Sequence, residues 1–150
     1  MRDIAAKRVL LPPPRHAGIK KTLVFDLDET LIHCLDEEEE GGSFDFSVPI
    51  AFPGGESVDA QVNVRPYAVE CLREANEHYQ VVVFTASHSN YADPILDYLD
   101  PTGELVQFRL YREHCVQTAE GLYVKDLRVL ANRDLKDVVI VDNAVHSFAF

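Results

Sequence analysis

Three short apolar runs form the framework of this sequence, at about residues 21–25, 81–84 and 138–141. Runs of this length, rich in β-branched residues, are typical of strands buried on both faces. Helices are expected between them, from Pro66 to about residue 78 and over about 90–99. Strands that alternate with helices predict an α/β fold, a Rossmann-like parallel sheet with helices on both faces.

A period-two pattern follows the first run. Apolar residues alternate with mostly polar ones over 44–52 and over 58–64, and the turn sequence Pro53-Gly54-Gly55 lies between them. This predicts a small β-hairpin inserted after the first strand, with one apolar face. Pro49 favours an edge position, because proline cannot donate to a strand on both sides. A further strand is expected over 105–111.

Polar side chains follow each of the three apolar runs directly. These residues are Asp26 and Asp28, Thr85 and Ser87, and Asp142 and Asn143. Ligands of open parallel sheets bind beyond the carboxyl ends of the strands. The six side chains are therefore expected to converge on one crevice.

Each of these signals has an ordinary structural explanation when taken alone. An Asp-rich loop is usually solvated, a strand-end threonine bonds its own backbone, and Lys125 would be a surface lysine. An Asp-Asn pair is a common turn or helix cap. Their joint occurrence in this order favours a functional site instead.

The chemistry that fits these residues is phosphoryl transfer. Asp26 can be the nucleophile that forms an aspartyl-phosphate, with its second oxygen on Mg²⁺. Asp28 can act as acid and base, and Thr85 can donate to a phosphate oxygen. Lys125 would neutralise the phosphoryl charge and the nucleophilic carboxylate. Asp142 and Asn143 would complete the metal site.

The segments DLDET, FTAS, YVKDL and VDN, in this order, resemble the four motifs of the haloacid dehalogenase superfamily. More narrowly, residues 21–150 resemble the FCP/SCP-type phosphatases, which act on the C-terminal repeat domain of RNA polymerase II. The resemblance implies a hydrolase, a phosphoprotein phosphatase that depends on Mg²⁺ and acts on phosphoserine or phosphothreonine.

The same resemblance implies a role for each motif residue. Asp26 is the nucleophile and a metal ligand, and Asp28 is the acid/base, with its backbone carbonyl on the metal. Thr85 and Lys125 bind phosphate. Asn143 ligates the metal, with Asp142 as a direct or water-mediated partner.

The resemblance also implies a substrate pocket. Ile50, Phe52 and Tyr91 would line an apolar pocket that receives a substrate proline, which points to Ser-Pro sites and polymerase-like substrates. Ala60 and His88 stand where bulkier aliphatic residues are expected.

The net charge and the cysteines of the chain limit the kinds of partner it can bind and the cellular compartment expected for it. The net charge of −11 argues against a nucleic-acid backbone as a direct partner. The acidic block at 36–40 is expected to be a solvated loop, with steering or repulsion of charged ligands as the alternative. Three widely spaced cysteines without a ligand motif indicate core fillers and a reducing compartment, the cytoplasm or nucleus.

The chain divides into a tail or linker at 1–18, marked by Pro12-Pro13-Pro14, and a phosphatase domain at 19–150. It contains no signal-peptide pattern and no membrane span. The sequence stops eight residues after Asp142. A sheet of this kind normally adds a helix and another strand, so the C-terminal part of the domain is expected to be missing.

Two other functions remain open at this stage. One is a phosphatase of another phosphoprotein or of a small molecule on the same core, and the other is a catalytically weak phosphopeptide-binding module. The small hairpin favours a peptide substrate, and the presence of both Asp26 and Asp28 argues against a binding module. Arg65 can either support the site or pair with an acid.

Overall fold

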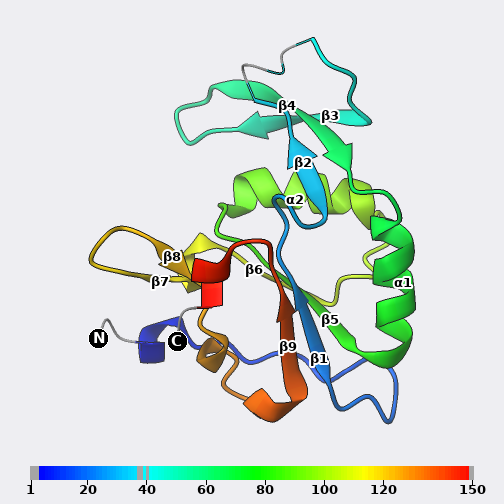
Figure 1. Ribbon diagram of the computed structural model, residues 1–150, viewed down its shortest axis with the longest axis vertical. Helices are drawn as coiled ribbons and strands as arrows, with labels where there is room; N and C mark the ends of the chain where they lie inside the picture. The colour runs from blue at the N-terminus through cyan, green and yellow to red at the C-terminus, as the bar shows by residue number, and fades with distance from the viewer. Residues whose placement is uncertain (1–3, 37–38, 40, 149–150) are drawn as a thin grey trace.

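The computed structural model describes residues 4–36, 39 and 41–148, and its centre is a four-stranded parallel sheet (Figure 1). In spatial order the strands are β6 (Phe108–Leu110), β5 (Gln80–Phe84), β1 (Thr22–Phe25) and β9 (Val138–Val141). Phe25 of β1 lies beside Val83 on one side and Val141 on the other. The residues that follow these three strands therefore meet at one edge. The predicted parallel α/β fold is confirmed.

Both α-helices, α1 (Ala68–His78) and α2 (Ser89–Leu99), lie on one face of the sheet. The apolar cluster on this face includes Leu72, Val81, Val83, Ile95 and Leu96. Their burial follows from helical and strand periodicity, which aim these side chains inward. This face is the main hydrophobic core.

Among the residues that the structure describes, none forms an α-helix on the opposite face of the sheet. The predicted helices of this face are present only as short 3-10 helices. One is Ile4–Lys7, in the N-terminal segment, and the other is Leu127–Val129. The connection from β6 to β9 is made of a two-stranded hairpin, β7 (Val116–Gln117) and β8 (Tyr123–Val124), and 3-10 turns. No segment in this connection has the length or apolar period of an α-helix.

The N-terminal segment packs against this second face from residue 4 onward. Leu11 is buried, and its backbone exchanges hydrogen bonds of 3.0 and 2.8 Å with the side-chain amide of Asn132. Gln80 donates to the carbonyl of Pro12 at 2.8 Å. Residues 4–12 are thus held against this face of the sheet. The division into a tail or linker at 1–18 and a phosphatase domain at 19–150 stays a prediction. Residues 1–3 lie outside the described part of the chain.

The predicted hairpin is confirmed and belongs to a small antiparallel sheet, which we call the flap. Its strands, in spatial order, are β2 (Ile32–Cys34), β4 (Ser57–Val64) and β3 (Phe46–Ala51). β3, with Pro49, is an edge strand of this sheet, as expected. The Phe46 ring stacks on Tyr98 of α2 at 3.7 Å between centroids, which anchors the flap above the sheet (Figure 1). Strand β2 was not predicted.

The bounds of two elements differ from the predicted ones, and local contacts or backbone conformation explain the difference. α1 begins at Ala68 rather than Pro66, because Tyr67 has a φ of 66°. β6 is shorter than the predicted strand at 105–111, because the buried Asp100 carboxylate accepts the amides of residues 104–106 at 2.8–2.9 Å. Those amides are turned away from strand pairing.

β9 is one of the two outer strands of the parallel sheet, and its Val139 and Val141 are exposed. A further C-terminal helix and strand remain a prediction. In the acidic block, residues 37, 38 and 40 lie outside the described part, so the predicted solvated loop is untested there. Among the described residues, no helix is long and apolar enough to cross a bilayer.

Candidate active site

Asp26 and Asp142 follow β1 and β9 directly and meet at Lys125, which follows β8. The Lys125 ammonium donates to Asp26 Oδ1 and, at 2.6 Å, to Asp142 Oδ2. All three side chains are buried, with exposed fractions of 3% for Lys125, 7% for Asp26 and 1% for Asp142. The sequence placed these three residues together, and the structure joins them in one cluster.

This cluster carries two carboxylates and one ammonium, so it is anionic as well as buried. Burial raises the pKa of Asp26 above its ordinary value, Lys125 opposes the rise, and Asp142 adds to it. The other oxygen of Asp26 accepts from the Thr30 hydroxyl at 3.1 Å. A further cation beside the two carboxylates would therefore be favourable electrostatically.

Asp28 lies two residues beyond Asp26, and Leu27 between them is fully buried in the core. This alternation directs both carboxylates toward the same edge of the sheet. Asp28 accepts hydrogen bonds from three hydroxyls, those of Tyr91 at 2.7 Å, Ser87 at 2.9 Å and Thr85 at 3.4 Å. Asp26 and Asp28 thus have different partners, an ammonium for one and hydroxyls for the other.

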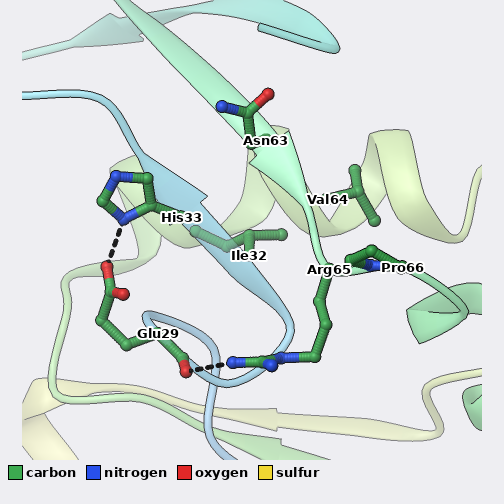
Figure 2. A pocket seen from close by; sticks show the side chains of 7 residues that line it. All are labelled: Glu29, Ile32, His33, Asn63, Val64, Arg65 and Pro66. Carbon is green, nitrogen blue, oxygen red and sulfur yellow. Dashed lines mark hydrogen bonds and ion pairs between the residues drawn. The ribbon is translucent and has the colours of Figure 1, made fainter. Parts of the chain in front are cut away.

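The loop after Asp28 is held by Arg65, the residue that follows β4. Glu29 has a φ of 62°, and the Arg65 guanidinium donates to the carbonyls of Glu29 at 2.9 Å and Thr30 at 2.5 Å. Figure 2 shows the contact between Arg65 and the Glu29 carbonyl, together with a 2.5 Å contact between the Glu29 carboxylate and His33. Glu29, His33 and Arg65 are among the residues that line a cavity of about 210 Å³. Of the two roles left open for Arg65, the structure supports the first.

A groove of about 670 Å³ begins at Asp28 and runs between the flap and the start of α2. It is lined by all three residues of the predicted substrate pocket, Ile50, Phe52 and Tyr91. One wall, from β3 and its turn, is apolar. The other wall carries His88 and Arg112, whose Nη1 lies 3.3 Å from His88 Nε2.

Asn143 lies apart from the hydrogen-bonded cluster. It is exposed and, with Asp142 and Arg65, lines a second cavity of about 420 Å³ beside the carboxylates. Ala60, which like His88 stands where a bulkier aliphatic residue is expected, is buried in the flap.

The donor set suits Mg²⁺, a hard cation that takes one or two carboxylates and completes its shell with phosphate oxygens and water. Asp26 and Asp142 supply buried carboxylate oxygens, and Asn143 offers an amide oxygen next in sequence. Within the described residues, no group of three or more His, Cys, Asp and Glu side chains is arranged so that it could hold a metal ion. The fit to Mg²⁺ rests on the two carboxylates and the neighbouring amide oxygen alone.

The contacts made by Arg65 and Arg112 were not predicted from the sequence, and Ser87 was assigned no role. Ser87 had a signal, since it is one of the polar residues after the second strand. Arg112 donates to the Ala86 carbonyl at 2.6 Å and stacks over the Tyr123 ring at 4.8 Å. Bonds to backbone carbonyls leave no residue pattern from which they could be predicted.

The parallel sheet and the carboxylate–lysine cluster define a haloacid dehalogenase-like domain, as the four motifs predicted. The chain belongs to the NLI interacting factor-like phosphatase family, whose profile matches residues 21–150.

The relatives include two proteins of Dictyostelium discoideum. A probable C-terminal domain small phosphatase is 48% identical, over 91% of this chain and 42% of its own length. CTD small phosphatase-like protein 2 is 43% identical, over 95% of this chain and 24% of its own length. The chain thus spans less than half the length of these two relatives.

A solved relative shares the fold. It is a variant of the fission yeast RNA polymerase II CTD phosphatase Fcp1 bound to beryllium fluoride, with a TM-score of 0.70 and 25% identity. The match covers 86% of this chain and 38% of that chain. The predicted FCP/SCP resemblance is confirmed.

Proposed function

We propose that this chain is a Mg²⁺-dependent protein serine/threonine phosphatase that works through an aspartyl-phosphate intermediate. The observation that carries the proposal is the buried Asp26–Lys125–Asp142 cluster, with the separately held Asp28 at the mouth of a groove. A structural salt bridge would not need a second buried carboxylate, because burial of an unbalanced charge costs several kcal/mol.

Asp26 is the nucleophile in this mechanism. One of its oxygens attacks phosphorus while the bond between phosphorus and the substrate oxygen breaks. Lys125, held by Asp26 and Asp142, offsets the charge on the phosphoryl group and on the carboxylate. The Thr85 hydroxyl lies at the end of β5, where it is proposed to bind a phosphate oxygen. The Thr85 N–H was also expected to bind phosphate, but it donates to the Leu110 carbonyl of β6 at 2.9 Å and is used in the sheet instead.

Asp28 moves the protons. It donates one to the leaving alkoxide and then takes one from the water that attacks the aspartyl-phosphate. The second displacement breaks the bond between phosphorus and Asp26 and releases inorganic phosphate. Asp26 and Asp28 can divide these tasks because their surroundings differ.

Mg²⁺ is proposed to be held by Asp26, Asp142, Asn143 and the backbone carbonyl of Asp28, and it supplies electrophilic charge to the phosphoryl oxygens. The fit rests on the oxygen donors and the net negative charge of the cluster.

The proposed substrate is a phosphoserine or phosphothreonine peptide lying in the groove. A volume of about 670 Å³ and an open apolar wall with Ile50 and Phe52 suit an extended chain with an apolar residue such as proline. The relatives are named for the C-terminal domain of RNA polymerase II. We therefore propose a substrate with phosphorylated Ser-Pro sites, such as the C-terminal domain of RNA polymerase II. The proposed location is the nucleus or the cytoplasm.

The alternatives are a small-molecule phosphatase and a phosphopeptide-binding module. The experiment is phosphate release from a phosphoserine-proline peptide and from para-nitrophenyl phosphate, with Mg²⁺ and with chelator. We expect metal-dependent turnover that Asp26→Asn abolishes and a higher kcat/KM for the peptide. Turnover of small esters alone would favour the first alternative. Metal-independent turnover, or none from folded protein, would contradict the proposal.

A further inference from the structure

The groove and the proposed acid/base share a residue. Tyr91 lines the groove, and its hydroxyl donates to Asp28 Oδ1 at 2.7 Å. On the other oxygen, Oδ2, Ser87 donates at 2.9 Å and Thr85 at 3.4 Å. Both oxygens of the carboxylate are therefore fixed, which defines the plane of the Asp28 carboxyl group as well as its position.

The donors are themselves fixed by the fold. The Ser87 N–H donates to the Thr85 hydroxyl at 3.0 Å, and the Ser87 carbonyl accepts from the Arg112 N–H at 3.0 Å. Tyr91 lies in the first turn of α2, and its ring packs against the main core. Because these groups are ordered before any substrate arrives, little conformational entropy is lost in orienting Asp28.

Hydroxyl groups suit a residue that must gain and lose a proton. A hydroxyl can donate to a carboxylate and, after rotation, accept from a carboxylic acid. Lysine or arginine could only donate and would favour the carboxylate alone.

We propose that Tyr91 and Ser87 are positioning residues that orient the Asp28 carboxyl group for proton transfer to the leaving alkoxide. This inference rests on the proposed phosphatase function. It gives Tyr91 a task beyond contact with the substrate, and it assigns Ser87 a task where sequence reasoning left it without one.

Leaving-group dependence separates positioning from a structural effect. An alkoxide needs a proton as it leaves, whereas para-nitrophenolate is a stable anion that needs little help. Both esters are too small to depend on the apolar wall of the groove. The parameter kcat/KM reports events up to phosphoryl transfer to Asp26 and is independent of later hydrolysis.

The experiment compares kcat/KM for free phosphoserine and for para-nitrophenyl phosphate in wild type, Tyr91→Phe and Ser87→Ala. We expect each variant to lose about 10- to 100-fold on phosphoserine and less than about 3-fold on the aryl ester. Ser87→Thr keeps a hydroxyl and should recover most of the loss. Tyr98→Phe is the control, because it removes a hydroxyl from the same helix, at the ring stacked on Phe46. It should leave kcat/KM unchanged for both esters.

Equal losses on both esters would overturn the positioning role, because they would indicate a general disturbance of the site. Unchanged kcat/KM for both small esters, with a raised KM for a phosphopeptide, would also overturn it and leave Tyr91 as a substrate contact. Wild-type protein that is inactive on every ester would instead contradict the proposed function itself.

Discussion

The Arg65 guanidinium donates to the Glu29 carbonyl at 2.9 Å, across 36 positions of sequence. Glu29 follows Asp28 directly and has a φ of 62°, a conformation that most residues adopt only at a cost. A second bond from Arg65, to the Thr30 carbonyl at 2.5 Å, holds the same turn. The flap is thereby tied to the loop that carries both candidate catalytic carboxylates.

Replacement of Arg65 should therefore impair catalysis without contact to the reacting atoms. We expect Arg65→Ala to lower kcat/KM for para-nitrophenyl phosphate by about 10- to 100-fold, since small displacements of catalytic groups carry penalties of this size. Arg73→Ala, on the exposed side of α1, is the matched control. Wild-type activity in Arg65→Ala would contradict the assigned role.

The negative charge of Asp26 should lower the stability of the folded protein, although catalysis requires it. Its pKa is raised in the folded protein, so the folded state binds the proton more tightly than the unfolded state. Asp26 therefore opposes folding at neutral pH, and this effect disappears as the pH falls below its ordinary value near 3.8.

We expect Asp26→Asn to be inactive in phosphate release and, without metal, to melt at a higher temperature than wild type at pH 7. The difference in melting temperature should shrink as the pH approaches 4. A variant that melts well below wild type at pH 7 would show that the Lys125 pair outweighs burial.

The N-terminal segment should contribute to stability through Leu11. Leu10 is 72% exposed and Leu11 is 3% exposed, so the two neighbours form a matched pair. Leu11→Ala should lower the free energy of unfolding by about 2–4 kcal/mol in urea titrations, and Leu10→Ala by less than about 0.5 kcal/mol. Equal effects would mean that residues 4–12 do not pack as described.

His33 should make the stability of the flap depend on pH. Hydrogen bonds with Glu29 and then Glu39 raise its pKa to about 9, against 6.5 for the free side chain. Its stabilising contribution is therefore complete below pH 6.5 and is lost as the pH rises through 9.

The pH effect should be small, because the His33 side chain is 40% exposed and its ion pairs are screened by solvent. The free energy of unfolding, measured at pH 6 and pH 9.5, should fall more for wild type than for His33→Gln. Parallel curves for the two proteins would refute the linkage.

Phe52 should act in recognition of the peptide rather than in chemistry. It lines the groove and is 47% exposed, so its ring is available to a substrate. Phe52→Ala is expected to raise KM for a phosphoserine-proline peptide by about 10-fold, an amount typical of one lost apolar contact. Its kcat/KM for para-nitrophenyl phosphate should stay at the wild-type value. Loss on both substrates would indicate a collapsed flap.

Much of the fold could be predicted because the hydrophobic pattern of neighbouring residues is sufficient to identify the main strands. β9 is apolar throughout, β1 and β5 are apolar after a polar first residue, and the hairpin alternates regularly. β2 could not be found in this way, because its three residues, Ile32–Cys34, are too few to display a period. The packing of Leu11 depends on Asn132, which lies 121 positions away and carries no local signal.

The candidate site shows the same division. Asp26, Asp28, Thr85 and Asp142 could be predicted to converge because each lies at or just beyond the end of a strand in one parallel sheet. The hydroxyls on Asp28 and the hold of Arg65 on the Glu29 carbonyl depend on how separate elements pack. Contacts of that kind follow from tertiary structure and not from spacing.

The most direct test of the account is to trap the covalent intermediate on Asp26. Protein mixed with a radiolabelled phosphoserine peptide and Mg²⁺ would be quenched in acid within milliseconds and digested, and the label located by peptide mapping. An aspartyl-phosphate mechanism predicts acid-stable, hydroxylamine-sensitive label on the peptide that contains Asp26 and none in Asp26→Asn. Label on another residue, or steady turnover with no label at any quench time, would contradict it.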